Sequence, residues 1–323
     1  MADIMLRLAA DERGARPVLV LQGGLEKSFA DEGFSGNFSL LNIDEPETVE
    51  NACRLQLAAG ADCAVTNTWE ATSSRLSASG LAASTADVNA SGMRIASGLG
   101  FTHVLAAVGP CGIEVERGSG TAALKAQDPA WSEVARDAEP ALGYSCAVEQ
   151  YAEQVAVLTS EGPDGLLLAG FSQLDDLLAA IDAAKRTCDL PVLACMTFGA
   201  AAEGAAEDAA PEGAAPAPVA PAEVARTLVK AGAAAVGCAG MAVEATVEAL
   251  GEMAAAVDVP LVAYPSVDGP ATSVPSDADA FAELALELVR AGASLVGVWG
   301  GATPVRTGAM FAAVGGCVSV PAV

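Results

Sequence analysis

The sequence predicts a single α/β domain, a closed (β/α)8 barrel spanning residues 1–323. Short apolar runs of strand length alternate along the chain with longer stretches whose apolar residues recur at helical spacing. No two successive apolar runs are joined by a tight hairpin turn, so we expect parallel strands connected by helical crossovers. Eight such units in series are typical of a barrel whose chemistry lies at the carboxyl ends of its strands.

The apolar runs give the strands in order. We expect them at Pro17–Leu21, Asp62–Thr66, His103–Val108, Gly165–Ala169, Val192–Met196, Ala234–Cys238, Leu261–Tyr264 and Leu295–Val298. The helical spacing between them predicts helices at Pro46–Ala59, Asp87–Ala96, Tyr151–Thr159, Asp175–Lys185, Ala222–Ala231, Val243–Ala256, Ala278–Ala291 and Val305–Val314.

Paired glycines follow the first and the last strand. Gly23-Gly24 predicts a tight turn after the first strand, and Gly300-Gly301 lets the backbone approach a ligand or a loop after the last. A doubly wound open sheet is the alternative fold. Against it, the first pair lacks the third glycine and the acidic residue of a dinucleotide-binding fingerprint.

One segment has a composition that does not support a packed structure. Residues 200–222 contain only Ala, Pro, Gly and Glu apart from one Asp and one Val. Such a segment cannot bury enough apolar surface to become ordered. Because strand and helix patterns resume directly after it, we interpret it as a mobile loop within one domain.

Composition limits the classes of partner. The chain carries a formal charge of -25, and that charge argues against nucleic acid and membrane-surface partners. No apolar run reaches the roughly 18 residues of a membrane span, and no secretory leader is visible. The eight cysteines form no CxxC pair. Reduced thiols and a cytoplasmic location are therefore expected, and the single histidine, His103, is expected in the core or at an interface.

Several motifs follow one another in a recognisable order. They are GADCAVTNTWEAT (60–72), AAVGPCG (106–112), YAEQVAVLTSEGPDGLLLAG (151–170), AAAVGCAG (233–240), LVAYPSVDGP (261–270) and GVWGGATP (297–304). Together they resemble the homocysteine S-methyltransferase family over nearly the whole chain. The resemblance implies a barrel of the homocysteine-binding type, and methyl transfer to a thiol or to and from a corrinoid or folate partner. It also implies a zinc ion held by three cysteines.

The zinc ligands that the resemblance implies are absent. The corresponding positions are Gly240, Gly300 and Gly301, which offer no side chain to a metal. We therefore expect no cofactor at these positions and do not expect the family's zinc mechanism to operate. The thiols Cys111, Cys195 and Cys238 are candidates for a relocated site, since soft thiolates suit zinc or Cu(I). Cys238 lies two residues before Gly240 and is expected on the same strand face. The alternative is that these thiols are small buried apolar groups.

The carboxylates that the resemblance places around the substrate are also replaced. Gln22, Val65 and Gly170 stand where the family has acidic residues. Each charged hydrogen bond contributes roughly 1.5–3 kcal/mol, so losing two would weaken binding of an amino acid by about 3–6 kcal/mol. These losses lie together at the expected mouth of the barrel.

The candidates for a cleft or substrate-binding site lie at the strand ends. They are Gln22, Gly23, Gly24, Asn67, Thr68, Gly109, Trp299, Gly300 and Gly301. Asn67 and Thr68 offer an amide and a hydroxyl to a polar ligand; the alternative is that they cap a helix or bind a loop carbonyl. Trp299 is expected to stack on a flat ligand or to fill the space of the missing metal. Trp69 also follows a strand end and could narrow the cleft. No catalytic residue is assigned.

Three functional hypotheses remain. The first is a divergent homocysteine S-methyltransferase-like enzyme that transfers methyl without the usual zinc. The second is a non-catalytic barrel that binds a small molecule or a partner methyltransferase or corrinoid protein. The third is a repurposed barrel enzyme that uses the relocated cysteines or Glu26; the alternative for Glu26 and Lys27 is a solvated loop pair.

Overall fold

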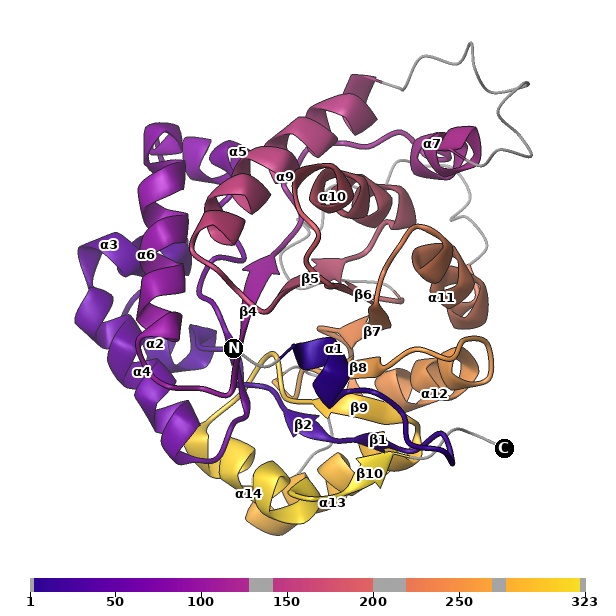
Figure 1. Cartoon of the computed structure of the whole chain (residues 1–323). Coiled ribbons are helices and arrows are strands. Elements are labelled where there is room, and N and C mark those ends of the chain that lie inside the picture. The colour runs from indigo at the N-terminus through magenta and orange to yellow at the C-terminus, as the bar shows by residue number, and fades with distance from the viewer. Residues whose placement is uncertain (1–2, 128–141, 200–218, 269–276, 320–323) are drawn as a thin grey trace.

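The computed structural model describes residues 3–127, 142–199, 219–268 and 277–319, which form a ring of parallel strands surrounded by helices (Figure 1). The strands of the ring are β2 (Leu19–Val20), β3 (Cys63–Val65), β4 (His103–Val108), β5 (Gly165–Phe171), β6 (Val192–Met196), β7 (Ala235–Ala239), β8 (Leu261–Tyr264) and β9 (Ala293–Val296). They pair in the order β2-β9-β8-β7-β6-β5-β4-β3.

A short parallel bridge closes the ring. Leu21, which directly follows β2, pairs with Cys63 at the start of β3. The Gln22 amide donates to the Cys63 carbonyl at 2.8 Å, and the Asp62 amide donates to the Val20 carbonyl at 2.8 Å. The two ends of the eight-stranded series are thus hydrogen-bonded to each other. This confirms the (β/α)8 barrel and excludes the open sheet.

Helices cover the outside of the barrel. They are α1 (Ile4–Arg7), α2 (Glu26–Asp31), α3 (Leu41–Asp44), α4 (Pro46–Ala58), α5 (Ser73–Ser77), α6 (Thr85–Ser97), α7 (Ser119–Gln127), α9 (Leu142–Ser160), α10 (Leu174–Thr187), α11 (Pro221–Lys230), α12 (Val243–Ala254), α13 (Ala278–Arg290) and α14 (Pro304–Val314), with 3-10 turns at Phe38–Leu40 and Ala82–Ser84. None of the helices in these ranges is long and apolar enough to cross a membrane.

Most expected elements are found, with shifted ends. The strands His103–Val108, Val192–Met196 and Leu261–Tyr264 have the predicted bounds. The last strand ends at Val296 rather than Val298, and its register with β8 shifts at Val262. The expected mobile loop falls mostly on residues 200–218, which lie outside the described residues, and its last two residues already belong to α11.

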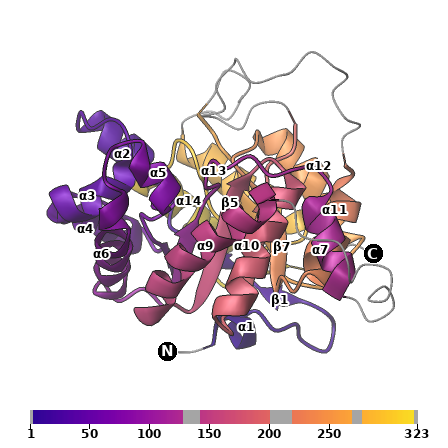
Figure 2. The same cartoon turned by 90° about the horizontal axis from the view of Figure 1, so that it is seen from above.

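Two apolar layers hold the barrel together. The inner layer fills the ring with side chains from all eight strands: Leu19, Leu21, Cys63, Leu105, Leu167, Ala169, Leu193, Cys195, Ala235, Ala239, Val262, Tyr264 and Leu295. Ile4 and Leu8, from and after α1, belong to the same cluster and cover one end of the barrel (Figure 2). The outer layer packs the strands against the helices. His103 is buried, as expected.

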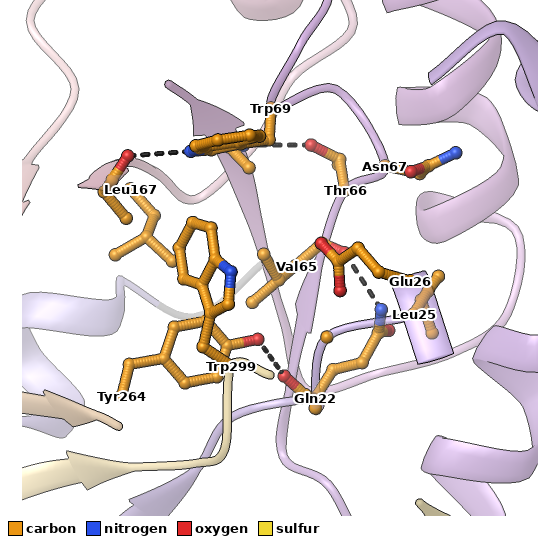
Figure 3. A pocket seen from close by; sticks show the side chains of 14 residues that line it. Gln22, Leu25, Glu26, Val65, Thr66, Asn67, Trp69, Leu167, Tyr264 and Trp299 are labelled. Atoms are coloured by element: carbon orange, nitrogen blue, oxygen red, sulfur yellow. Dashed lines mark hydrogen bonds between the residues drawn. The ribbon is translucent and has the colours of Figure 1, made fainter. Parts of the chain in front are cut away.

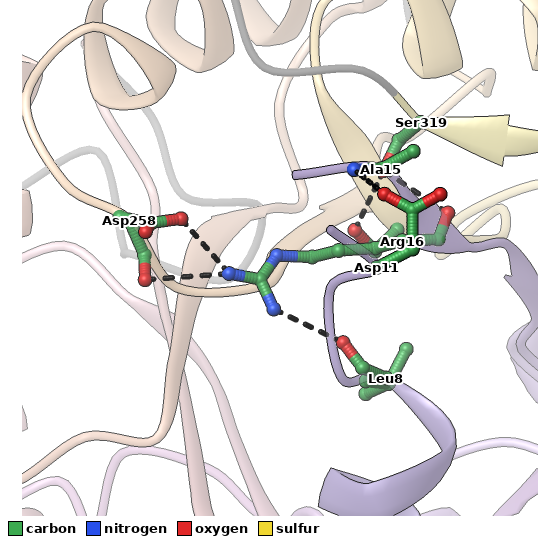
Figure 4. Close-up of polar contacts among 7 residues, drawn as sticks. Leu8, Asp11, Ala15, Arg16, Asp258 and Ser319 are labelled. Carbon is green, nitrogen blue, oxygen red and sulfur yellow. Dashed lines mark hydrogen bonds and ion pairs between the residues drawn. The ribbon is translucent and has the colours of Figure 1, made fainter. Parts of the chain in front are cut away.

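The two ends of the chain meet at the end of the barrel that α1 covers. β1 (Arg16–Pro17) pairs antiparallel with β10 (Val318–Ser319). The Arg16 guanidinium reaches across this end, donating to the Leu8 carbonyl at 3.1 Å and to Oδ1 of Asp258 at 2.9 Å (Figure 4). These contacts fix the start of β2 and leave the opposite end of the barrel to the loops that follow the strands.

We expect Gly237→Ala in β7 to destabilise the barrel, because an added Cβ atom would overlap the carbonyl oxygen of Val262 in β8. Overpacking of this kind costs about 1–3 kcal/mol of unfolding free energy. Gly251→Ala in α12 is the matched control, since an added methyl there meets no atom within 4 Å. Alanine in a helix is favoured by roughly 1 kcal/mol, so the control should gain stability. Urea denaturation of both variants tests this, and equal effects would contradict it.

Candidate functional site

A cavity opens at the carboxyl ends of the strands, opposite α1. Its empty volume is about 430 Å3, part of which is open to solvent. It is lined by Gln22, Gly23, Gly24, Leu25, Glu26, Val65, Thr66, Asn67, Trp69, Ala107, Leu167, Ala169, Tyr264 and Trp299 (Figure 3). We call it the mouth pocket. It contains most of the positions predicted for the cleft, but Thr68, Gly109, Gly300 and Gly301 do not line it.

Gln22 lies at the base of the mouth pocket with a fixed orientation. The side-chain Nε2 atom of Gln22 donates to the Val65 carbonyl at 2.9 Å. The backbone carbonyl of Gln22 accepts a hydrogen bond from the Tyr264 hydroxyl at 2.6 Å. Only the amide nitrogen can donate to a carbonyl, so Oε1 must be the free end. That oxygen is buried and has no hydrogen-bond partner.

Glu26, the first residue of α2, is the acidic group of the mouth pocket. As a residue it is half-buried, but its Oε2 atom is buried without a hydrogen-bond partner. Burial raises its pKa to about 7; its own backbone N–H lowers the pKa, and the charge of Glu70 raises it further. Lys27 points away from the pocket and pairs with Asp31 at 3.3 Å. The interpretation of Glu26 as part of a solvated loop pair is therefore wrong, since a buried oxygen cannot be solvated.

Trp69 closes one side of the mouth pocket, and two glycines make room for it. Its Nε1 atom donates to the Ala169 carbonyl at 2.8 Å. An added Cβ atom at Gly109 would overlap the indole, and one at Gly170 would lie 2.8 Å from Cζ2. Gly170 also has a φ of +82°, which other residues rarely adopt. Gly170 stands where the resemblance places an acidic residue, so the indole lies against a position that an acidic side chain would occupy.

Trp299 and Tyr264 complete an aromatic wall. The Trp299 ring meets the Trp69 ring edge to face, with centroids 5.3 Å apart, and meets the Tyr264 ring at 5.4 Å. The turn after β2 approaches the Trp299 backbone so closely that a Cβ atom at Gly24 would overlap the Trp299 carbonyl. Gly24 is therefore required for the approach of two loops.

Asn67 and Thr68 use their polar groups within the protein. Nδ2 of Asn67 donates to the Phe38 carbonyl at 2.8 Å and to Oδ1 of Asn42 at 3.0 Å. The Thr68 hydroxyl is fully buried and donates to the Ala107 carbonyl at 2.7 Å. Both side chains are therefore engaged with the protein itself, Asn67 with the 3-10 turn and α3, and Thr68 with a carbonyl of β4.

Sequence reasoning assigned no role to Gln154, although it lies in the YAEQ motif. Nε2 of this buried side chain donates to the Thr68 carbonyl at 2.7 Å and to Oδ1 of Asn89 at 3.0 Å. It therefore holds the loop after β3 that carries Trp69. The tyrosine of the same motif, Tyr151, donates to Asp176 at 2.7 Å and accepts from the Cys111 amide at 2.9 Å. Burial raises the pKa of Asp176 to about 6.

The residues at the implied zinc positions do not fit a zinc ion. Gly240 and Gly301 have φ values of +70° and +78°, and neither has a side chain that could coordinate a metal. A Cβ atom at Gly301 would overlap Oδ1 of Asp268, so that carboxylate lies where a cysteine side chain would begin. The Gly300 carbonyl accepts from the Val267 amide at 3.0 Å. Zinc held in the family's manner lacks ligands here.

The structure does not bring the three candidate thiols together as a metal site. Cys195 belongs to the inner layer, whereas Cys238 and Cys111 belong to the outer layer. Burial raises the pKa of all three thiols, to about 12 for Cys238. Within the described ranges, no group of three His, Cys, Asp or Glu side chains could hold a metal ion. Cys238 lies in the outer layer, between the strand β7 and the helices that cover it.

The raised pKa of Glu26 predicts a pH-dependent stability. The carboxyl group binds its proton more tightly in the folded state, with a pKa of about 7, than in the unfolded state, at 4.5. The contribution of Glu26 to the free energy of unfolding is therefore fully present below about pH 4.5 and is lost as the pH rises through 7. Glu70 and Tyr264 are the other titratable groups whose charges act on it, and both disfavour the carboxylate when they are ionised.

We expect Glu26→Gln to raise the unfolding free energy near pH 8 by about 1–3 kcal/mol and to leave it unchanged near pH 4. Urea denaturation at both values measures the difference. Glu32→Gln, an exposed change at the end of the same helix, should have little effect at either value. A Glu26→Gln variant whose stability follows wild type across this range would contradict the assigned pKa.

Comparisons with known proteins agree with this architecture. A model of the homocysteine S-methyltransferase family matches residues 19–317. The metallated form of the homocysteine methyltransferase MmuM from Escherichia coli is similar, with 20% identity over 92% of this chain and 96% of that one, and a TM-score of 0.67. Its oxidized form gives 22% identity over 95% and 98% of the two chains, with a TM-score of 0.65.

A methyltransferase from Methanosarcina mazei shares 12% identity over 97% of each chain, with a TM-score of 0.56. At these identities the structural likeness shows a common barrel fold. No curated protein sequence matches at the significance threshold applied. The family match is the stronger finding, because it extends from β2 to the residue before β10. The chain therefore belongs to the homocysteine S-methyltransferase family.

Proposed function

We propose that this protein transfers a methyl group to or from a small molecule bound in the mouth pocket, without a cysteine-bound zinc ion. Its family and the methyltransferases that share its fold support methyl transfer. The position of the pocket supports it as well, since catalysis in (β/α)8 barrels takes place at the carboxyl ends of the strands. A corrinoid or folate partner is the proposed source or recipient of the methyl group.

One observation carries the proposal. Gln22 and Glu26 each leave a buried oxygen without a partner in the same cavity. A buried polar atom without a partner costs about 1–3 kcal/mol. Gln56, His103 and Gln154 also carry such atoms, but only those of Gln22 and Glu26 belong to residues that line the mouth pocket. A bound molecule that donates hydrogen bonds to both oxygens would remove this cost.

Homocysteine is a poor candidate for the bound molecule. The residues that line the mouth pocket in the described part of the chain include no Lys or Arg to pair with an amino-acid carboxylate. A free thiol is only a few per cent thiolate at pH 7, and a metal ion ordinarily corrects this. Burial raises the pKa of the Cys195 and Cys238 thiols, so neither supplies a thiolate for such a role. We therefore propose a substrate other than this amino acid.

A second function is a barrel that binds a small molecule, or a partner methyltransferase subunit, without catalysis. The glycines at all three implied zinc positions favour it. The two functions differ in whether methyl is transferred, while both require that the mouth pocket is occupied.

An isotope experiment separates them. The protein is incubated with a metabolite extract and 13C-methyl-labelled corrinoid or folate donors, and mass spectrometry detects labelled products. We expect labelled product in the presence of a zinc chelator, and its loss in Glu26→Gln but not in Glu32→Gln. Transfer that a chelator abolishes and zinc restores would contradict the proposed metal independence. Absence of transfer from every donor would favour the binding function instead.

A further inference from the structure

Two oxygen atoms in the mouth pocket call for hydrogen-bond donors that the protein does not supply. Gln22 lines the pocket, and its Oε1 atom is buried without a partner while the nitrogen of the same amide is held by the Val65 carbonyl. Oε2 of Glu26 is also buried without a partner, and both residues line the mouth pocket (Figure 3). Both atoms accept hydrogen bonds when Glu26 is ionised. Their complement is a ligand that offers two or more N–H groups.

The rest of the mouth pocket favours a flat, weakly polar body. Indoles form part of its wall at Trp69 and Trp299, and the phenol ring of Tyr264 lies beside them. Val65, Leu167 and Ala169 add apolar surface. Aromatic side chains attract planar rings and cations through the negative charge of their faces. The Nε1 atom of Trp69 is already bonded to the Ala169 carbonyl, so this indole offers its ring rather than its donor.

We propose that the mouth pocket binds a flat nitrogen base, a conjugated amidine or an amino-heterocycle. Its N–H groups donate to Oε1 of Gln22 and Oε2 of Glu26, and its ring lies against the indoles of Trp69 and Trp299. The assignment rests on the proposed function only in taking this molecule as the methyl substrate; its binding is argued from the pocket alone.

A positive charge on the ligand would make its binding depend on pH. A protonated base stabilises the carboxylate form of Glu26, which burial disfavours in the free protein. Binding therefore releases a proton below the pKa of about 7, and the affinity falls about tenfold for each pH unit below it. Glu70 acts on the same carboxylate with a like charge, and the ordinarily neutral Tyr264 hydroxyl is bonded to the Gln22 carbonyl. Lys27 is paired with Asp31 and does not compete for the site.

Three probes of one shape test the charge and the donors separately. Benzamidine is a flat cation with N–H donors at two nitrogens, benzamide is its neutral counterpart, and benzoate is its anionic counterpart without donors. Isothermal titration between about pH 6 and pH 8.5 measures the binding of each. We expect benzamidine to bind at least tenfold more tightly than benzamide, benzoate not to bind, and benzamidine affinity to rise with pH up to about 7 and then to level off.

Variants locate the binding site. Glu26→Gln should weaken benzamidine binding about ten- to a hundredfold, because a charged hydrogen bond is replaced by a neutral one. It should also remove the pH dependence below 7. Glu32→Gln, which removes an exposed charge from the end of α2, should leave the affinity unchanged. Circular dichroism confirms that each variant is folded before titration.

Several results would overturn the assignment. They are the absence of benzamidine binding, equal binding of benzamidine and benzamide, binding of benzoate, and an affinity that Glu26→Gln does not change. The isotope experiment fails or succeeds independently of these titrations. Methyl transfer without benzamidine binding would overturn the ligand class alone, and benzamidine binding without methyl transfer would overturn the enzymatic function alone.

Discussion

Closure of the strand ring is the constraint on which the rest of the structure depends. The bridge from Leu21 to Cys63 joins the first strand to the second, and β2 pairs with β9 on its other side. Once the ring is closed, the carboxyl ends of all the strands point to the same opening. Residues as distant in sequence as Gln22 and Tyr264 then meet, and the Tyr264 hydroxyl lies 2.6 Å from the backbone carbonyl oxygen of Gln22. Arg16 and the paired terminal strands fix the opposite end of the barrel.

At the mouth of the barrel, glycines make room for bulky groups of neighbouring loops. Replacing the zinc-binding cysteines by glycine would not by itself require this packing. Gly109 and Gly170 leave the space that the Trp69 indole fills, and Gly24 leaves the space for the Trp299 carbonyl. Gln154 holds the loop that carries Trp69 through its hydrogen bond to the Thr68 carbonyl. Small residues and large ones are thus matched across the loops that follow β2, β3, β4 and β9 and the end of β5. This matching is expected of a pocket that has kept a role with a changed ligand.

The sequence predicted the fold well, because the apolar runs and their spacing reflect local structure and burial directly. It predicted the site less well, for reasons that individual residues make clear. Glu26 was left open between a group of the repurposed site and a solvated loop pair, because the sequence does not show that its Oε2 atom becomes buried. Cys195 and Cys238, both considered for one metal site, belong to different layers of the barrel, and their neighbours come from distant parts of the chain. The space for Trp69 depends on Gly109 after β4 and on Gly170 in β5, and contacts of that range cannot be derived from one sequence.

The central claim is that an unpaired acid beneath an aromatic wall has taken the place of a metal-bound thiolate site. The most direct measurement is the pKa of the Glu26 carboxyl group in the free protein. A 13C NMR titration of glutamate side chains, assigned with Glu26→Gln, gives that value. The account predicts a titration midpoint near 7, and a midpoint near the ordinary value of 4.5 would contradict it.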